Sequence, residues 1–319
     1  MKILIVIGTR PEIIKFAPLI KVLSMNKSDF KILHTNQHYD ENMNNTFFKE
    51  LSLPNPDFNL EYTHNEYQMG GLIKSFDNFF VDNYFDIVLV LGDTNSTLAA
   101  ALSAKKNKLK LGHVEAGLRS HQIYMNEEVN RIVVDHISDF LFTPTYYSKK
   151  NLIKEGISNE NIFVTGNTIV DAVNQNKIEA SKKSVLLSRL SLKNKEYFIG
   201  TFHRAENVDS SESIDRLLEI IKIVHEHIEL PFLWPIHPRT QKVIDADEIN
   251  LDNYIIPISP LGYFDFLDAL QNSRLAITDS GGIQEESCTL GVPCITTRES
   301  TERQETVLNK SNYLVGLDK

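Results

Sequence analysis

The hydrophobic pattern of the chain is a succession of short apolar runs separated by longer stretches in which apolar residues recur every three or four positions. Residues 3–7 form the first run, and a helical pattern with Ile13, Ile14, Ala17 and Leu19 follows it directly. Short apolar runs indicate strands buried on both faces, whereas the longer periodic stretches indicate helices. The pattern therefore predicts parallel sheets covered by helices.

Two series of such strands follow one another along the chain. The first comprises residues 3–7, 31–35, 87–91, 109–114, 140–142 and 162–165, and the second comprises residues 198–202, 232–235, 254–258, 275–278 and 294–296. Residues 180–195 are rich in Ser and Lys and lack a strong apolar face, which is typical of a connection between domains. We therefore predict two Rossmann-like α/β domains, residues 1–180 and 181–319, with a binding cleft between them.

Charge and composition narrow the possible partners. The net charge of −9 and the lack of a dense Lys/Arg block argue against nucleic acid or an anionic membrane. No apolar run approaches a membrane span, and residues 1–8 do not fit a signal peptide. Cys288 and Cys294 are too few for a disulfide framework and form no metal-type pair. We expect a cytoplasmic protein that holds no metal.

Polar residues follow the strands of the first series at the points where these strands end. Arg10 follows the first strand, Asp93 follows residues 87–91, and Glu115 follows residues 109–114. Because parallel strands end at one edge of a sheet, these three side chains should converge there. Two carboxylates crowded at such an edge raise the pKa of at least one of them, so that one can act as an acid and the other as a base. The alternatives are a solvated Arg10 in an ordinary turn and an Asp93 that caps the next helix.

The second series carries the same kind of signal. His203 follows residues 198–202, and Ser280-Gly281-Gly282 opens a helix directly after residues 275–278, which exposes backbone N–H groups to a phosphate. Glu286, about one turn further, is placed to accept hydrogen bonds from ribose hydroxyls. The alternative is a simple tight turn. Neither a P-loop motif nor a G-x-G-x-x-G motif after the first strand occurs, so we expect no nicotinamide cofactor.

Two further acids, Glu127 and Glu128, precede an apolar helical pattern for which Asn126 is a plausible N-cap. Acids in a first helical turn are favoured by the helix dipole by about 0.3 to 1 kcal/mol each. By itself, this segment therefore indicates the start of a helix and gives no sign of a catalytic role.

Taken together, the motifs resemble those of the non-hydrolysing UDP-N-acetylglucosamine 2-epimerases. They lie in order along nearly the whole chain, at residues 8–15, 37–40, 92–94, 113–119, 127–131, 203–207, 280–286 and 301–303. The resemblance implies the two-domain GT-B architecture. It also implies reversible conversion of UDP-GlcNAc to UDP-ManNAc, by elimination of UDP to a 2-acetamidoglucal and re-addition, without a cofactor.

The resemblance also implies roles for individual residues. Asp93, Glu115, Glu127 and His203 would form the catalytic set, which replaces the helix-start interpretation of Glu127. Arg10 and Lys15 would contact the diphosphate. The remaining UDP-sugar contacts would come from Leu261 and Phe266 at the uracil, Ser280, Gly281 and Gly282 at the phosphates, Glu286 at the ribose and Arg303 at the nucleotide end.

Several positions depart from the pattern of this family. Ala205 and Gln304 replace a common Arg and a common Pro, and the segment between Arg119 and Glu127 is short. These departures leave open an epimerase of a modified UDP-amino sugar. The nucleotide-binding motifs would also suit a GT-B glycosyltransferase or a non-catalytic UDP-sugar sensor. Family members usually continue beyond the position of Lys319, so we expect a truncated or unusually short member, and we expect a homodimer.

Overall fold

The computed structural model describes residues 1–35, 41–60 and 69–316, and the chain divides into two compact units, Met1–Ala172 and Val173–Lys319. The predicted motif at residues 37–40 lies outside the described residues. Helix α7 (Thr168–Lys183) runs through both the division between the units and the predicted boundary after residue 180.

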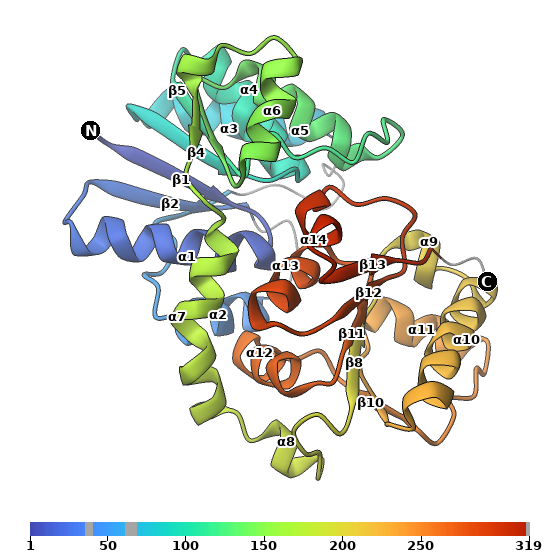
Figure 1. Ribbon diagram of the computed structural model, residues 1–319. Coiled ribbons are helices and arrows are strands. Elements are labelled where there is room, and N and C mark those ends of the chain that lie inside the picture. Colours follow the sequence, from blue (N-terminus) through green and yellow to red (C-terminus); the bar gives the residue numbers. More distant parts are fainter. Residues whose placement is uncertain (36–40, 61–68, 317–319) are drawn as a thin grey trace. The chain divides into compact units, whose positions relative to one another are not determined.

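The first unit alternates strands and helices along the chain (Figure 1). Its described strands are β1 (Ile3–Ile7), β2 (Phe30–His34), β3 (Phe58–Asn59), β4 (Ile87–Leu91), β5 (Lys110–Val114), β6 (Phe140–Thr143) and β7 (Ile162–Val164). Before α7, its described α-helices are α1 (Arg10–Met25), α2 (Glu41–Glu50), α3 (Met69–Asp82), α4 (Asn95–Lys106), α5 (Asn126–Ile137) and α6 (Tyr146–Lys154).

In the described part of this unit the strands form one seven-stranded parallel sheet in the order β3-β2-β1-β4-β5-β6-β7. Every residue of β1 and β4 is buried, which explains why their sequences are continuous apolar runs without polar alternation. Leu4 and Val6 pack with Phe76 of α3 and Ala100 of α4 in one core cluster. The strand order reverses between β1 and β4, and open α/β sheets bind ligands at such a point.

The second unit repeats the same architecture. Its described strands are β8 (Phe198–Thr201), β9 (Phe232–Pro235), β10 (Ile255–Ile258), β11 (Ala276–Thr278), β12 (Cys294–Thr296) and β13 (Asn312–Leu314). Its described helices are α8 (Leu186–Arg189), α9 (Ala205–Val208), α10 (Ser211–Ile228), α11 (Pro238–Ala246), α12 (Tyr263–Asn272), α13 (Gly281–Leu290) and α14 (Gln304–Leu308).

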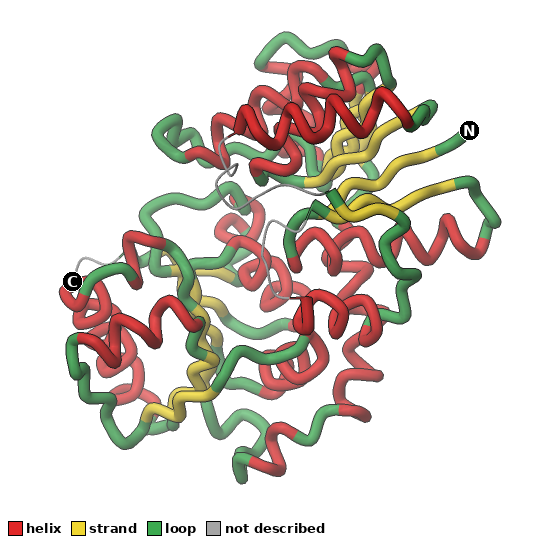
Figure 2. Tube along the Cα trace, turned by 180° about the vertical axis from the view of Figure 1, so that it is seen from behind, coloured by secondary structure: helices red, strands yellow, loops and turns green. Residues whose placement is uncertain are grey.

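Here the described strands form a six-stranded parallel sheet in the order β10-β9-β8-β11-β12-β13. Helices lie on both faces of this sheet, α10 and α11 on one and α12 and α13 on the other (Figure 1), and Figure 2 shows the same layers from behind. Trp234 is fully buried in the core beneath α10, with Phe202 and Phe232 at ring distances of 5.9 Å and 6.0 Å. The order reverses between β8 and β11.

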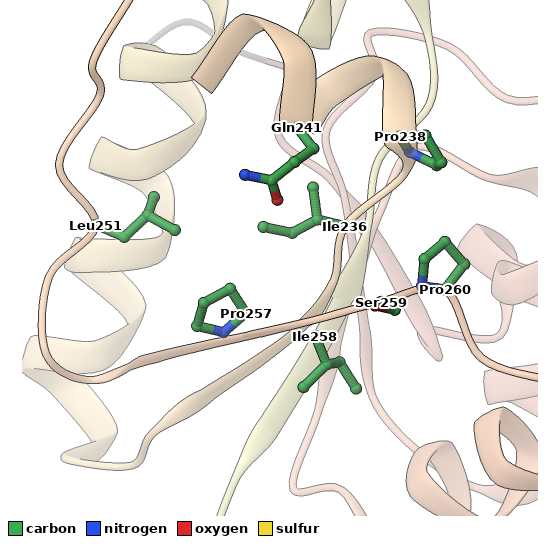
Figure 3. A pocket seen from close by; sticks show the side chains of 8 residues that line it. All are labelled: Ile236, Pro238, Gln241, Leu251, Pro257, Ile258, Ser259 and Pro260. Carbon is green, nitrogen blue, oxygen red and sulfur yellow. The ribbon is translucent and has the colours of Figure 1, made fainter. Parts of the chain in front are cut away.

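A hollow of about 450 Å³ opens beside β9 and β10 in the second unit (Figure 3). It is lined by Ile236, Pro238, Gln241, Leu251, Pro257, Ile258, Ser259 and Pro260. None of these side chains is charged, and Pro260 directly precedes Leu261, which is predicted to contact the uracil. Among the described helices, none is both long enough and apolar enough to cross a membrane.

The predicted fold class, two Rossmann-like α/β domains, is confirmed. Two interpretations of helix caps are wrong. Asn126 is the first residue of α5 and does not cap it, because Met125 occupies the cap position. The cap of α4 is Thr94, whose hydroxyl accepts a hydrogen bond from the Thr97 N–H. Asp93 therefore does not cap this helix. Residues 180–195, the predicted connection between domains, contain the end of α7 and all of α8.

Candidate active site

The carboxyl edge of the first sheet carries Arg10, Asp93 and Glu115. Arg10 is the first residue of α1, directly after the β1 turn, while Asp93 follows β4 and Glu115 follows β5. Strands β1, β4 and β5 are neighbours in the sheet, so the structure brings these three residues to one edge. The guanidinium of Arg10 also lies over the ring of Phe47, 5.8 Å from its centre.

Glu12 joins the loops that follow β1 and β4. Its buried carboxylate accepts the N–H groups of Gly8 at 2.5 Å and Thr9 at 2.8 Å, and the hydroxyls of Thr94 at 2.8 Å and Thr97 at 3.2 Å. Burial raises the pKa of Glu12, although these four donors oppose the shift. The two loops that carry Arg10 and Asp93 are therefore held together by one acid.

Lys15 and Glu115 form a buried ion pair. Lys15 Nζ lies 2.5 Å from Glu115 Oε2, and the two residues are only 4% and 7% exposed. The backbone φ of Glu115 is +70°, a left-handed conformation that costs a non-glycine residue roughly 1–3 kcal/mol and that often marks functional sites. Lys15 thus contacts a predicted catalytic acid in this structure, while its predicted contact with a diphosphate remains a prediction.

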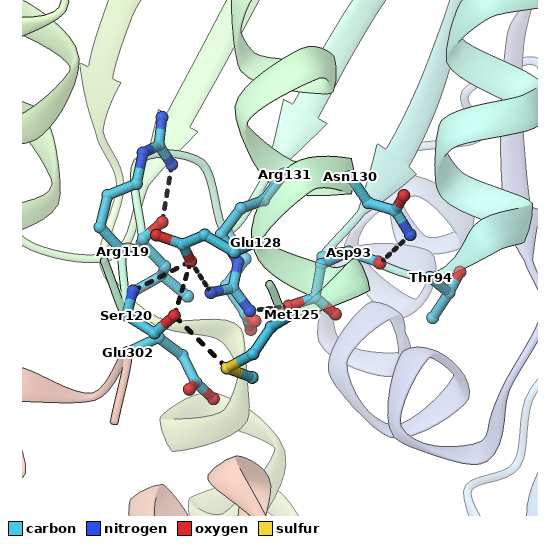
Figure 4. Close-up of polar contacts among 12 residues, drawn as sticks. Asp93, Thr94, Arg119, Ser120, Met125, Glu128, Asn130, Arg131 and Glu302 are labelled. Carbon is cyan, nitrogen blue, oxygen red and sulfur yellow. Dashed lines mark hydrogen bonds and ion pairs between the residues drawn. The ribbon is translucent and has the colours of Figure 1, made fainter. Parts of the chain in front are cut away.

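Asp93 is held by Arg131, which also pairs with Glu128 (Figure 4). The carboxylate of Glu128 accepts hydrogen bonds from the N–H groups of Ser120 at 3.0 Å and His121 at 2.8 Å. Burial favours a higher pKa for Glu128, but these hydrogen bonds and the charge of Arg131 outweigh it and lower the pKa. Glu128 is therefore a charged anchor within the structure.

Glu127, the predicted catalytic residue beside it, has a different setting. It lies in the first turn of α5, and its side chain is exposed. Glu128 is thus a buried acid that orients Arg131, whereas Glu127 is an accessible acid on the same helix turn. The catalytic role of Glu127 stays a prediction.

The edge of the second sheet is organised by Asp279, which follows β11. This fully buried carboxylate lies 2.9 Å from His203 Nδ1 and accepts the N–H groups of His203 and Arg204 and the side-chain amide of Asn207. Burial favours a higher pKa for Asp279, but His203 and the other donors lower it. The imidazole of His203 is 54% exposed, and Nδ1 is fixed by the carboxylate, so Nε2 is the ring atom left for a substrate.

Ser280 occupies the cap position of α13, and Gly281 and Gly282 begin the helix. A Cβ on Gly281 would lie very near a carboxylate oxygen of Glu302, so this side chain packs closely against the glycine. Arg303 adjoins the same position and lies 3.3 Å from Glu285. Backbone N–H groups at the start of a helix commonly bind phosphate, and the phosphate contact of Ser280 and the two glycines stays a prediction.

Glu286 is buried one turn into α13, where its charge adds to burial in raising the pKa of Tyr263. Leu261 and Phe266 are partly buried and pack against the core of the second unit. Leu261 precedes α12, and Phe266 lies in its first turn. The other predicted nucleotide contacts of this unit lie on or beside α13, namely Ser280, the two glycines, Glu286 and Arg303. In the described ranges, no group of three His, Cys, Asp or Glu side chains is arranged to hold a metal ion.

Sequence reasoning missed the residues that hold the predicted ones. Asp279 and Arg131 fix His203 and Asp93, and Glu128 in turn fixes Arg131. The signal for Asp279 was present, since it is a charged residue at the end of a buried strand. Arg131 and Glu128 lie in the motif at residues 127–131, but their contacts could not be predicted, because these join a helix to a distant loop.

Fold and site together define a two-domain Rossmann-like α/β protein with acids at the edge of one sheet and an open helix start at the edge of the other. A sequence profile described as UDP-N-acetylglucosamine 2-epimerase matches residues 21–319. The chain belongs to this family, as its sequence motifs predicted.

Similarity to individual relatives extends over nearly the full chain. The UDP-N-acetylglucosamine 2-epimerase of Methanococcus maripaludis is 47% identical over 326 residues, covering 99% of this chain and 88% of that protein. The crystal structure of Methanocaldococcus jannaschii UDP-GlcNAc 2-epimerase in complex with UDP-GlcNAc and UDP is 45% identical, with a TM-score of 0.92 and coverage of 100% and 90%. The UDP-2,3-diacetamido-2,3-dideoxy-D-glucuronate 2-epimerase of Pseudomonas aeruginosa is 37% identical over 321 residues, covering 99% and 88%.

Proposed function

We propose that the protein is a non-hydrolysing UDP-N-acetylglucosamine 2-epimerase that interconverts UDP-GlcNAc and UDP-ManNAc. The observation that carries this proposal is the gathering of Asp93 and Glu115, each paired with a cation, at one sheet edge of a chain from this family. The 45% identical archaeal structure, which contains UDP-GlcNAc and UDP, supports the substrate.

The chemistry requires a leaving group before it requires a base. The C2 hydrogen of the hexose is not next to a carbonyl, so direct deprotonation is too difficult. Cleavage of the C1–O bond sends its electron pair to UDP and gives C1 oxocarbenium character, which acidifies the C2 hydrogen. Loss of that proton leaves a 2-acetamidoglucal, and re-addition of UDP with protonation from the other face gives the epimer.

We assign the two proton transfers to the acids of the first unit, Asp93, Glu115 and Glu127. A positioned acid or base contributes roughly a hundred- to ten-thousand-fold to the rate. Arg10, His203 and the backbone N–H groups at Gly281 and Gly282 stabilise the departing diphosphate, because charge-assisted donors favour an anion as it forms.

The second unit supplies the nucleotide contacts in this proposal. Ser280 with the two glycines binds the phosphates, Glu286 the ribose, Leu261 and Phe266 the uracil, and Arg303 the nucleotide end. The burial of Glu286 and the start of α13 at Gly281 and Gly282 support these roles. No nicotinamide enters the proposed reaction, since neither the elimination nor the re-addition transfers a hydride.

A second candidate is an epimerase of a modified UDP-amino sugar. The 37% identical Pseudomonas aeruginosa relative, whose name specifies a diacetamido uronate, favours this alternative, as does Ala205 after His203-Arg204. A GT-B glycosyltransferase is disfavoured because transfer to an acceptor does not need several acids near C2.

A direct turnover assay distinguishes these candidates. The purified chain is incubated with UDP-GlcNAc, and separately with UDP-2,3-diacetamido-2,3-dideoxy-glucuronate, without added nicotinamide, and the anomeric protons are followed by NMR. We expect UDP-GlcNAc to reach a mixture of two C2 epimers. Conversion of the uronate alone would favour the second candidate, the epimerase of a modified UDP-amino sugar. Conversion of neither sugar would contradict both candidate functions. Glu160→Gln, at an exposed site in the first unit, is the control variant.

We also propose that the protein is a cytoplasmic homodimer. The two thiols, Cys288 and Cys294, are free, in keeping with a reducing compartment. Light scattering coupled to size exclusion tests the dimer, and a monomeric mass at assay concentration would contradict it.

A further inference from the structure

A buried polar network lies beneath the acids of the first unit, and Asp135 of α5 is its centre. Asp135 Oδ1 lies 2.7 Å from His113 Nδ1, and His113 Nε2 lies 2.8 Å from the carbonyl oxygen of Gly92. Asp135 Oδ2 accepts the Gly117 N–H at 3.1 Å and the guanidinium of Arg119 at 2.7 Å. One carboxylate thus holds two loops by separate oxygens, the loop at Gly92 through His113 and the loop at Gly117 directly.

These two loops are the ones that carry the proposed catalytic acids. Gly92 precedes Asp93 directly, and Gly117 stands two positions after Glu115. Asp135 itself is 1% exposed, and His113 is fully buried. Neither side chain is therefore placed to touch a substrate, and any effect on the reaction must pass through the loops.

The loop after β5 needs such an anchor because of its backbone conformation. Glu115 has a φ of +70° and Gly117 a φ of +81°. A non-glycine residue persists in the left-handed region only where its surroundings fix it. Here the Phe142 carbonyl accepts the N–H groups of Glu115 and Ala116 at 3.1 Å, and Asn151 donates to the Gly117 carbonyl at 3.0 Å, which leaves the Gly117 N–H to Asp135.

We propose that Asp135 is a positioning residue that sets the placement of both Asp93 and Glu115, acting through His113 on the first loop and through the Gly117 N–H on the second. The inference rests on the proposed epimerase function, since it assigns a task to a residue behind that site. Its chemistry is that of an orienting carboxylate, which fixes donors and exchanges no proton with the sugar.

The charges around Asp135 favour its ionised form. Burial acts to raise the pKa of Asp135, but His113 and Arg119 together lower it. Arg119 continues the network to Glu155, with Arg119 Nη2 2.6 Å from Glu155 Oε2, and Glu155 lies 3.9 Å from His136 Nε2. A neutral amide at position 135 could not accept from His113, Gly117 and Arg119 together.

Asp139 offers a matched control four positions later. It also accepts a backbone N–H, that of Leu111 at 2.9 Å, and it also pairs with a cation, Lys105 at 2.7 Å. Leu111 lies near the beginning of β5, however, so Asp139 acts at the opposite edge of the sheet. Asp135→Asn and Asp139→Asn therefore remove similar interactions from opposite ends of one strand.

The test compares these two variants in the full chain. We expect Asp135→Asn to lower kcat by on the order of 100-fold, the effect of a displacement of about 1 Å in a catalytic group. Its KM and its affinity for UDP should change little, because neither of the two loops that Asp135 holds carries a proposed UDP contact. Asp139→Asn should keep a kcat near that of the unmodified chain.

The unfolding of each variant is measured in parallel by denaturant titration. The value of kcat is then measured under conditions in which each variant is folded. If Asp135→Asn does not fold, His113→Asn replaces it, since this change removes the ring that joins Asp135 to Gly92 and should also lower kcat at constant UDP affinity. An unchanged kcat, or equal losses in the Asp135 and Asp139 variants, would overturn the positioning role alone. Absence of turnover by the unmodified chain would instead overturn the proposed function and this inference with it.

Discussion

Lys15 and Glu115 are separated by 100 residues in the sequence and by 2.5 Å in the structure. Removing one partner of a buried ion pair typically costs about 3–5 kcal/mol, because the remaining charge keeps its desolvation penalty. We expect Lys15→Met to destabilise the first unit by about 3 kcal/mol. The double variant Lys15→Met/Glu115→Gln should recover part of this loss.

The measurement is denaturant unfolding, monitored through the hydrogen exchange of amides in the first unit. Trp234 is the only tryptophan of the chain and lies in the core of the second unit, so its fluorescence serves as the internal control. Additive effects of the two substitutions would show that the pair contributes no coupling energy.

Glu115 itself permits a separate kinetic prediction. We expect Glu115→Gln to reduce kcat by roughly a hundred- to ten-thousand-fold, since the amide cannot exchange a proton with C2. The affinity for UDP should remain unchanged, because Glu115 is assigned to the sugar. Calorimetric titration with UDP and NMR turnover, with Glu160→Gln as control, measure the two effects. A variant that binds UDP poorly but turns over normally would reassign Glu115 to nucleotide binding.

At this scale the sequence indicated the acids but not their partners. Asp93 and Glu115 could be found because strand ends in a parallel sheet point to one edge. The cations that pair with them, Arg131 and Lys15, lie on helices whose rotation about the sheet is set by packing. Only the fold could reveal that Lys15 faces Glu115 or that Asp135 joins two loops.

The segment between β8 and α9 depends on one carboxylate, Asp279. Because its pKa in the folded protein is lowered, its stabilising contribution is fully present above the ordinary Asp pKa of about 3.9 and is lost as the pH falls through the lower folded value. We expect Asp279→Asn to destabilise the second unit at pH 7, and this difference from the unmodified chain should shrink below about pH 4.

Urea unfolding monitored by Trp234 fluorescence at a series of pH values measures this difference. Asp247→Asn is the control, since Asp247 is exposed in the same unit. A difference that stays constant down to the most acidic pH would show that the Asp279 carboxylate is not the source of the stabilisation.

Among the elements, strands were predictable and helix ends were not. Buried strands such as β4 occur as continuous apolar runs, and the predicted residues 87–91 match its bounds. The short strand β3 has only two residues and left no pattern. Caps such as Thr94 are chosen by local hydrogen bonds among several eligible polar residues, so the sequence left Asp93 and Asn126 as plausible but wrong choices.

For the whole molecule, the repeated alternation of strands and helices sufficed to predict two Rossmann-like domains. Ordered motifs from Arg10 to Arg303 also sufficed to predict the family, which the matching profile confirms. The identity of the sugar was less accessible. The UDP-sugars named for relatives at 47% and 37% identity differ at C3 and C6, so the choice of sugar depends on a few contacts around those positions.

The most direct test of the account is turnover of UDP-GlcNAc in D2O, followed by NMR at C1 and C2. Elimination and re-addition exchange the C2 hydrogen with solvent, so the epimerised UDP-sugar should carry deuterium at C2 without any added nicotinamide. Glu115→Gln should slow this incorporation in step with turnover. Epimerisation with full retention of the original C2 hydrogen would contradict the mechanism.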